Sequence, residues 1–147
     1  MSLGCVINHW DLTLGSRVLR GPDGAIVPTP GTLTAGVNEG ISKAITEGWA
    51  FRCLPHEQIQ CNGGIIVPPC AYADIDLGGT SFFFTGTNQP ALSINSFLGG
   101  RFRTFGRWTY SGTNGNAAMV INPSAPDPQY GSKSIQFAEI DIPAMQI

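Results

Sequence analysis

Residues 77–121 repeat one rhythm: short apolar or aromatic runs are interrupted by Gly, Asn and Thr, and charged residues are sparse. Gly and Asn adopt the backbone conformations of tight turns, while aromatic and β-branched residues favour strands. Together with the flanking segments, this pattern predicts about ten strands at intervals of roughly 8 to 12 residues. We therefore expect an all-β fold, a single domain over residues 1–147 that forms a jelly-roll-like β-sandwich or a compact β-barrel with at most one short helix.

Two turn motifs predict β-hairpins. The first is GPDG at residues 21–24, and the second is NG at residues 62–63. Proline presets the backbone angle of a turn, and glycine or asparagine takes its left-handed position. The strands expected on either side are residues 17–20 with 25–28, and residues 58–61 with 64–67.

One helix is expected at residues 38–47, where apolar side chains recur at helical spacing. A loop or a strand edge is the alternative, because the segment is short and contains Gly40. Asn38 is the expected N-cap and Gly48 the expected stop. Residues 49–54 then alternate with the period of two that is typical of a half-buried strand. The remaining expected strands are residues 72–77, 81–85, 91–98, 101–110, 117–121 and 135–142, with a surface loop at 123–131.

The chain is poor in charge. Charged residues make up 12% of it, about half of the usual share of roughly 25%. The net charge of −2 gives no basic field, so we expect no nucleic-acid partner. No apolar run approaches the roughly 18 to 20 residues that span a bilayer, so we expect no membrane segment. The first residues lack a basic segment followed by an apolar core, and no secretory signal is visible.

Cysteine and histidine residues form one candidate metal site. Its members are types that bind zinc, but their spacing lacks the Cys-x2-Cys pair of familiar zinc sites. A Cys61–Cys70 disulfide is the alternative in an oxidising compartment. The interpretation we favour is that the cysteines are reduced and buried, and that no metal or other cofactor is bound. The weak zinc candidate consists of Cys53, His56, Cys61 and Cys70.

Two pairs of carboxylates lie two residues apart on expected strands: Asp74 with Asp76, and Glu139 with Asp141. Each pair points to one face of its strand. Such pairs occur in calcium sites and in glycosidases, but the commoner role is the solvated face of a strand. No nucleophile or acid-base pair has a partner at informative spacing, so we expect the protein not to be an enzyme.

The segment RFRTFGRWTY at residues 101–110 is the strongest candidate for an interaction surface. If it is one strand, its three arginines share one face, interrupted by Phe105, and its other aromatic residues share the opposite face. Arginine and aromatic side chains dominate the hot spots of protein interfaces. The alternative is a core-facing aromatic row with an arginine outer face and no ligand. The candidate interface or ligand residues are Arg101, Arg103, Phe105, Arg107 and Trp108.

Two functional classes fit these features. The first is a structural or assembly protein of a virion, such as a phage or viral capsid, decoration or tail component, acting as a homo-oligomer or with other structural subunits. Low charge combined with many Gly, Thr, Asn and Pro residues favours it. The second is a lectin-like carbohydrate-binding module, in which Asn and Thr of the loops at 86–88 and 112–114 and the aromatic rings of Trp10, Trp49 and Trp108 bind a glycan. We therefore expect the protein in a virion or an extracellular particle.

Overall fold

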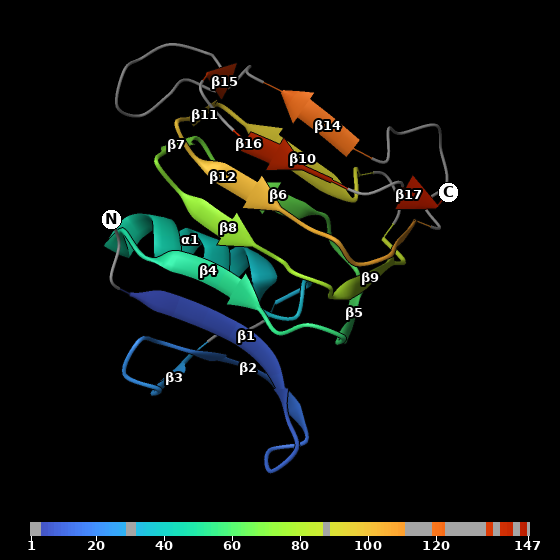
Figure 1. Cartoon of the computed structure of the whole chain (residues 1–147). Helices are drawn as coiled ribbons and strands as arrows, with labels where there is room; N and C mark the ends of the chain where they lie inside the picture. Colours follow the sequence, from blue (N-terminus) through green and yellow to red (C-terminus); the bar gives the residue numbers. More distant parts are fainter. Residues whose placement is uncertain are drawn as a thin grey trace.

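The structure, a computed structural model, describes residues 4–28, 32–86, 89–110, 119–122, 135–136, 139–142 and 145–146. From β4 onward the chain coils, and successive strands join four sheets in rotation (Figure 1). The first coil contains β4 (Ala50–Cys53), β5 (Gln58–Cys61), β6 (Ile65–Val67) and β7 (Cys70–Ala71); the second contains β8 (Asp74–Asp76), β9 (Ser81–Phe84), β10 (Leu92–Asn95) and β11 (Phe97–Leu98); the third contains β12 (Arg101–Arg103), β13 (Trp108–Tyr110), β14 (Met119–Asn122) and β15 (Ile135–Gln136); β16 (Glu139–Asp141) and β17 (Met145–Gln146) follow.

Each coil strand pairs in parallel with its counterpart one coil later. In the first sheet, for example, β4 pairs with β8, β8 with β12, and β12 with β16. The same succession holds for β5–β9–β13–β17, β6–β10–β14 and β7–β11–β15. The four sheets therefore surround one core as a parallel β-solenoid.

The mostly-β class predicted from the sequence is confirmed, with a single helix in the described part of the chain. The strand pairing does not fit the expected jelly roll or barrel. Those folds are built from antiparallel strand pairs, whereas the coil strands pair in parallel. The predicted hairpin at residues 62–63 is wrong for the same reason. β5 pairs with β9 and β6 with β10, so Asn62 and Gly63 lie at a corner between two sheets. Turn residues serve such corners as well as hairpins.

The predicted hairpin at residues 21–24 is confirmed. β2 (Ser16–Arg20) and β3 (Ile26–Val27) pair antiparallel, and the Gly24 amide donates to the Gly21 carbonyl oxygen at 2.9 Å. β2 also pairs antiparallel with β1 (Cys5–Asp11), which pairs in parallel with β4. These three strands extend the first sheet to seven, in the order β16-β12-β8-β4-β1-β2-β3.

The helix α1 (Val37–Glu47) covers the end of the core next to β4 and β6 (Figure 1). Gly48 ends it in the left-handed conformation, as predicted. Asn38 is not the N-cap: the helix begins one residue earlier, after Gly36. The Asn38 side chain instead bonds to the backbone of β6 and its approach, donating to the Gly64 carbonyl oxygen and accepting from the Ile66 amide, both at 2.9 Å.

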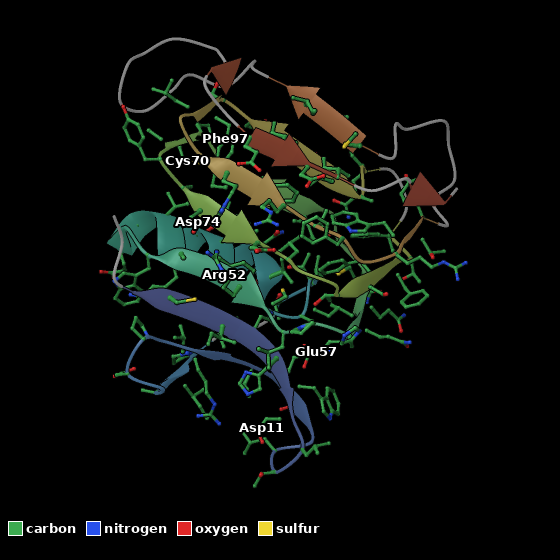
Figure 2. All side chains as sticks on the ribbon, viewed as in Figure 1. Asp11, Arg52, Glu57, Cys70, Asp74 and Phe97 are labelled. Atoms are coloured by element: carbon green, nitrogen blue, oxygen red, sulfur yellow. The ribbon has the colours of Figure 1, made fainter. Side chains whose placement is uncertain are left out.

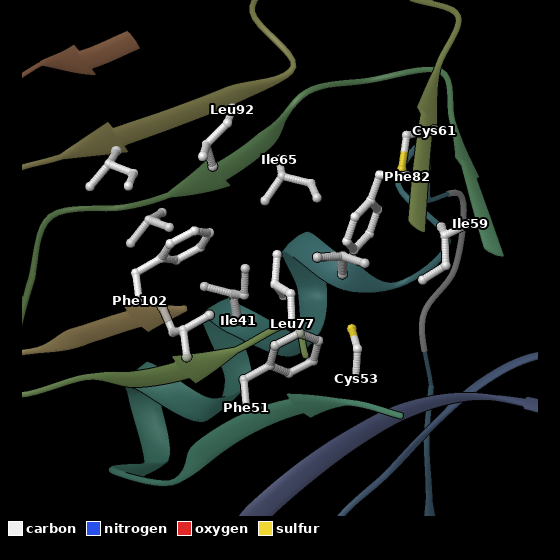
Figure 3. Close-up of a cluster of buried hydrophobic side chains, with 14 of the residues drawn as sticks. Ile41, Phe51, Cys53, Ile59, Cys61, Ile65, Leu77, Phe82, Leu92 and Phe102 are labelled. Carbon is white, nitrogen blue, oxygen red and sulfur yellow. The ribbon is translucent and has the colours of Figure 1, made fainter. Parts of the chain in front are cut away.

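Inward-pointing side chains of successive coils stack in columns (Figure 3). Phe51, Ile75 and Phe102 form one such column in the seven-stranded sheet, and all three are buried. Ile41 of α1 lies at the same end of the core as Phe51. The helix thus closes the apolar columns where they begin.

Several predicted segments lie outside the described residues: the strand residues 117–118, the loop residues 87–88 and 112–114, and the loop at 123–131. No helix of the described part is long and apolar enough to cross a membrane.

Candidate interaction face

Charged side chains gather on the outer face of the seven-stranded sheet. Residues paired in register point to the same side of a sheet, and successive residues alternate between its two sides. This rule places four of the chain's eight basic residues and five of its ten acidic residues on one face. This charged face consists of Asp11, Arg20, Arg52, Asp74, Asp76, Arg101, Arg103, Glu139 and Asp141.

The sign of charge alternates from strand to strand across the four coil strands of this sheet. Arg52 on β4 is followed by two aspartates on β8, two arginines on β12 and two carboxylates on β16. In register, Asp74 lies beside Arg101 and Arg101 beside Glu139. Each charged strand therefore has neighbours of opposite charge.

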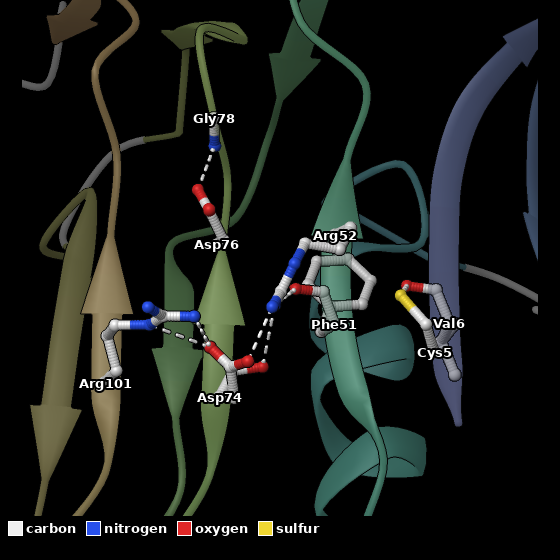
Figure 4. Close-up of polar contacts among 8 residues, drawn as sticks. All are labelled: Cys5, Val6, Phe51, Arg52, Asp74, Asp76, Gly78 and Arg101. Carbon is white, nitrogen blue, oxygen red and sulfur yellow. Dashed lines mark hydrogen bonds and ion pairs between the residues drawn. The ribbon is translucent and has the colours of Figure 1, made fainter. Parts of the chain in front are cut away.

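Asp74 is the best-connected member of the charged face. Its carboxylate forms ion pairs with Arg52 Nη2 of β4 at 2.5 Å and with Arg101 Nη2 of β12 at 3.0 Å (Figure 4). Arg101 Nε adds a second hydrogen bond to the same oxygen of Asp74, Oδ1, at 3.1 Å. Arg52 and Asp74 lie side by side on neighbouring strands in Figure 2. One carboxylate thus links three strands.

These contacts shift the ionisation of the charged face. Partial burial acts to raise the pKa of Asp74, but hydrogen bonds from Arg52 and Arg101 outweigh it, and the pKa is lowered. The hydrogen bond to Asp74 raises the pKa of Arg101 in turn, with a further contribution from Glu139. The charged forms are therefore the stable ones.

The predicted interface residues are only partly brought together. Arg101 and Arg103 share the charged face, and the Arg103 guanidinium lies 4.9 Å from the centre of the Phe105 ring, which is 52% exposed. Arg107 does not continue their row, because the chain turns between β12 and β13 into another sheet. Gly106 makes this turn possible: a Cβ atom there would lie 1.7 Å from the Thr80 carbonyl oxygen.

Trp108 is the clearest correction among the candidate interface residues. It is 1% exposed, and its ring centre lies 4.9 Å from that of Phe82 and 5.2 Å from that of Phe84. Its indole nitrogen donates to Thr104 Oγ1 at 2.9 Å. Trp108 belongs to the core and offers no surface to a partner or a sugar.

The zinc candidates are not brought together. Within the described residues, no group of three or more His, Cys, Asp or Glu side chains could hold a metal ion. None of the four cysteines forms a disulfide, so the alternative Cys61–Cys70 bond is absent. Burial raises the pKa of Cys61 to about 12 and raises that of Cys53 further. The favoured interpretation of buried thiols agrees with Cys53, Cys61 and Cys70, whereas Cys5 is half-buried.

The carboxylate pairs occupy the solvated side of their strands, as their commoner interpretation predicts. Ile75, between Asp74 and Asp76, is buried, and Ile140, between Glu139 and Asp141, packs against the core. What sequence reasoning missed is their relation to each other and to Arg52. The charged-apolar-charged triplets at residues 74–76, 101–103 and 139–141 are an internal repeat, and that repeat was the available signal.

A second polar cluster ties the N-terminal strands to the first coil. The Arg17 guanidinium forms an ion pair with Glu57 and donates to the Gln58 carbonyl oxygen at 2.5 Å. Glu57 also accepts from the Trp10 amide at 2.6 Å, and Arg17 lies 5.6 Å from the centre of the Trp10 ring. Figure 2 shows Glu57 close to this part of β1.

A recess of about 210 Å³ lies between the end of α1 and the turn before β8. Trp49, Tyr72 and Asp74 are among the residues that line it. Tyr72 is 68% exposed and has a φ of 58°, a backbone conformation that residues other than glycine rarely adopt. Strain of this kind is concentrated at functional sites.

Comparison of the chain with protein-family models, curated proteins and solved structures finds no match.

Proposed function

We propose that this protein is a non-enzymatic structural or assembly protein that acts as a homo-oligomer, as a capsid, decoration or tail component of a virion. The observation that carries the proposal is the alternating sign of the charged face. A chain with few charges has placed half of them on one face of one sheet, where successive strands carry opposite signs. Electrostatic patterns of this kind select partners and fix their register.

The pattern is complementary to itself under one twofold axis. An axis that lies in the contact plane, parallel to the strands and midway between β8 and β12, brings β8 of one copy against β12 of the other. Asp76 then faces Arg103, Asp74 faces Arg101, and Arg52 faces Asp141. An axis across the strands would instead bring each strand against itself, with like charges opposed. Twofold dimers have this isologous geometry.

The residues at the centre of this arrangement suit an interface. The half-buried side chain of Arg103, on β12 beside the twofold axis, lies against the exposed ring of Phe105. Arginine and aromatic side chains are enriched at interface hot spots.

The genomic neighbourhood of the gene tests the proposed virion role. We expect capsid, portal or tail genes beside this one, and a metabolic operon would argue against the role.

Charge reversal at the centre tests the homo-oligomer. Arg103→Glu places a carboxylate opposite Asp76 of the second copy, and we expect the dissociation constant to rise about tenfold or more, because like charges across an interface repel. Arg107→Glu makes the same chemical change at an exposed residue away from the sheet and should leave association unchanged. Light scattering with size-exclusion chromatography gives the mass. Equal effects of the two substitutions, or a monomeric wild type, would refute the proposal.

The second candidate is a carbohydrate-binding module. The recess beside Trp49 favours it, because aromatic faces and a carboxylate contact the apolar and hydroxyl sides of a sugar ring. Its test is NMR titration with a panel of oligosaccharides, comparing wild type with Tyr72→Ala. Saturable shifts that the substitution abolishes would support it, and a blank panel would remove it.

A further inference from the structure

The two ends of the solenoid differ in the partners of their outermost strands. At the first coil, the outer edges of three strands have partners. β4 pairs with β1, Asn38 bonds to the edge of β6, and Arg17 donates to the Gln58 carbonyl oxygen of β5. At the other end, β14, β15, β16 and β17 are each the last strand of their sheet in the described part of the chain.

Apolar columns lose their cover at this second end. Leu92 and Ile94 on β10 are fully buried. Met119 and Ile121, their partners in register on β14, are 38% and 46% exposed. The apolar columns thus extend to the last coil of the described chain, where their side chains are much more exposed than in the coil before.

Among the described residues from β16 onward, at this end, the charged side chains are all acidic. Glu139 and Asp141 on β16 are both exposed and continue the alternation after Arg101 and Arg103 on β12. If the alternation continued by one more strand, that strand would carry basic residues at both positions. A second copy paired edge to edge through β16 would oppose four carboxylates, which disfavours it.

We propose that this end of the solenoid accepts, as a parallel strand beside β16, an extended segment of another polypeptide with a basic-apolar-basic sequence. In this register the two basic side chains lie beside Glu139 and Asp141, and the apolar side chain between them lies beside Ile140. The backbone of the segment takes the outer edge of β16, as in other cases where an extended peptide adds a strand to a sheet. The twofold association uses the outer face of the sheet and shares Asp141 with this site, whereas the backbone of the segment takes the outer edge of β16.

A synthetic peptide with the sequence of residues 99–110, GGRFRTFGRWTY, is a suitable probe. This sequence already forms β12, which pairs with the acidic strand β8 in the protein. The control peptide carries glutamate in place of both Arg101 and Arg103. We expect the basic peptide to bind wild-type protein about tenfold more tightly, as two weak ion pairs allow. NMR shifts should appear at residues 139–141.

Two protein variants make the assignment specific. Glu139→Gln with Asp141→Asn removes the charge at the edge, and the two peptides should then bind alike. Asp23→Asn, on the β2–β3 turn, is the control and should keep the preference for the basic peptide. Failure of wild type to prefer the basic peptide, or a preference that survives neutralisation of β16, overturns the proposal. Neither result decides the homo-oligomer proposal, because the Arg103→Glu test measures the mass of the assembly and not peptide binding.

Discussion

At the scale of single residues, Asp74 holds the charged face together. It accepts hydrogen bonds from Arg52 on β4 and Arg101 on β12, so one carboxylate spans three strands. The side chain is about one-third exposed, and solvent screening therefore limits what each ion pair contributes. Its contribution should nevertheless show in the dependence of stability on pH.

Asp74→Asn should lower the free energy of unfolding by about 1 kcal/mol at pH 7. Because the pKa of Asp74 is lowered in the folded state, its ionised form stabilises the fold above the unfolded pKa of about 4. That stabilisation is lost as the pH falls through the folded pKa. Urea unfolding of both proteins from pH 7 to about pH 2.5 should show the difference closing below about pH 4. A constant difference across this range would contradict the assigned role.

Trp108 illustrates how burial decides the role of an aromatic residue. Trp108→Ala should lower the free energy of unfolding by about 3 to 5 kcal/mol, because it removes a large ring packed against Phe82 and Phe84. Trp10→Ala, at an exposed ring, is the matched control and should cost much less. Urea unfolding measures both. Similar losses for the two substitutions would place Trp108 outside the core.

At the scale of elements, α1 acts as an end cap. Its apolar side closes the core columns, and Asn38 satisfies a donor and an acceptor at the edge of β6. A strand edge without partners is open to pairing with other chains. The helix therefore stabilises the first coil and also occupies the edge of β6, where another strand could otherwise pair.

Asn38→Ala should lower the free energy of unfolding by about 2 kcal/mol, since it leaves two backbone groups without partners. Ser42→Ala, on the exposed side of the same helix, is the control and should change stability little. Hydrogen exchange should locate the effect: the Ile66 amide should exchange faster in Asn38→Ala. Unchanged protection at Ile66 would show that the side chain does not cap this edge.

Local elements were predictable from sequence because their signals are local. The hairpin at residues 21–24, the helix stop at Gly48 and the alternation of residues 49–54 each depend on neighbouring residues. The pairing of β5 with β9 depends on segments far apart in the chain, and the turn at Asn62 looks the same in a hairpin and at a solenoid corner. The arginine face of β12 was predictable; the partners that complete it were not recognised as a repeat.

At the scale of the whole molecule, parallel coiling converts three separate triplets into one continuous part of the charged face. Because register is kept from β8 to β12 to β16, charges of opposite sign become neighbours and the face becomes complementary to a second copy. The same coiling leaves one end covered by α1, while the described residues at the other end are acidic and apolar. We propose that the lateral face and the β16 end both serve assembly, the first with a second copy and the second with an extended segment.

Native mass spectrometry of two mixed variants tests whether the charged faces of two copies meet across the proposed twofold axis. Arg103→Glu alone opposes acidic groups across the twofold axis, and Asp76→Arg alone opposes basic groups, so each protein should be mainly monomeric. When they are mixed, Asp76 of the first variant faces Arg103 of the second, and the introduced glutamate faces the introduced arginine. We expect a heterodimer in the mixture, whereas each variant alone stays mainly monomeric. A mixture that stays monomeric although the wild type is dimeric would rule out the twofold arrangement.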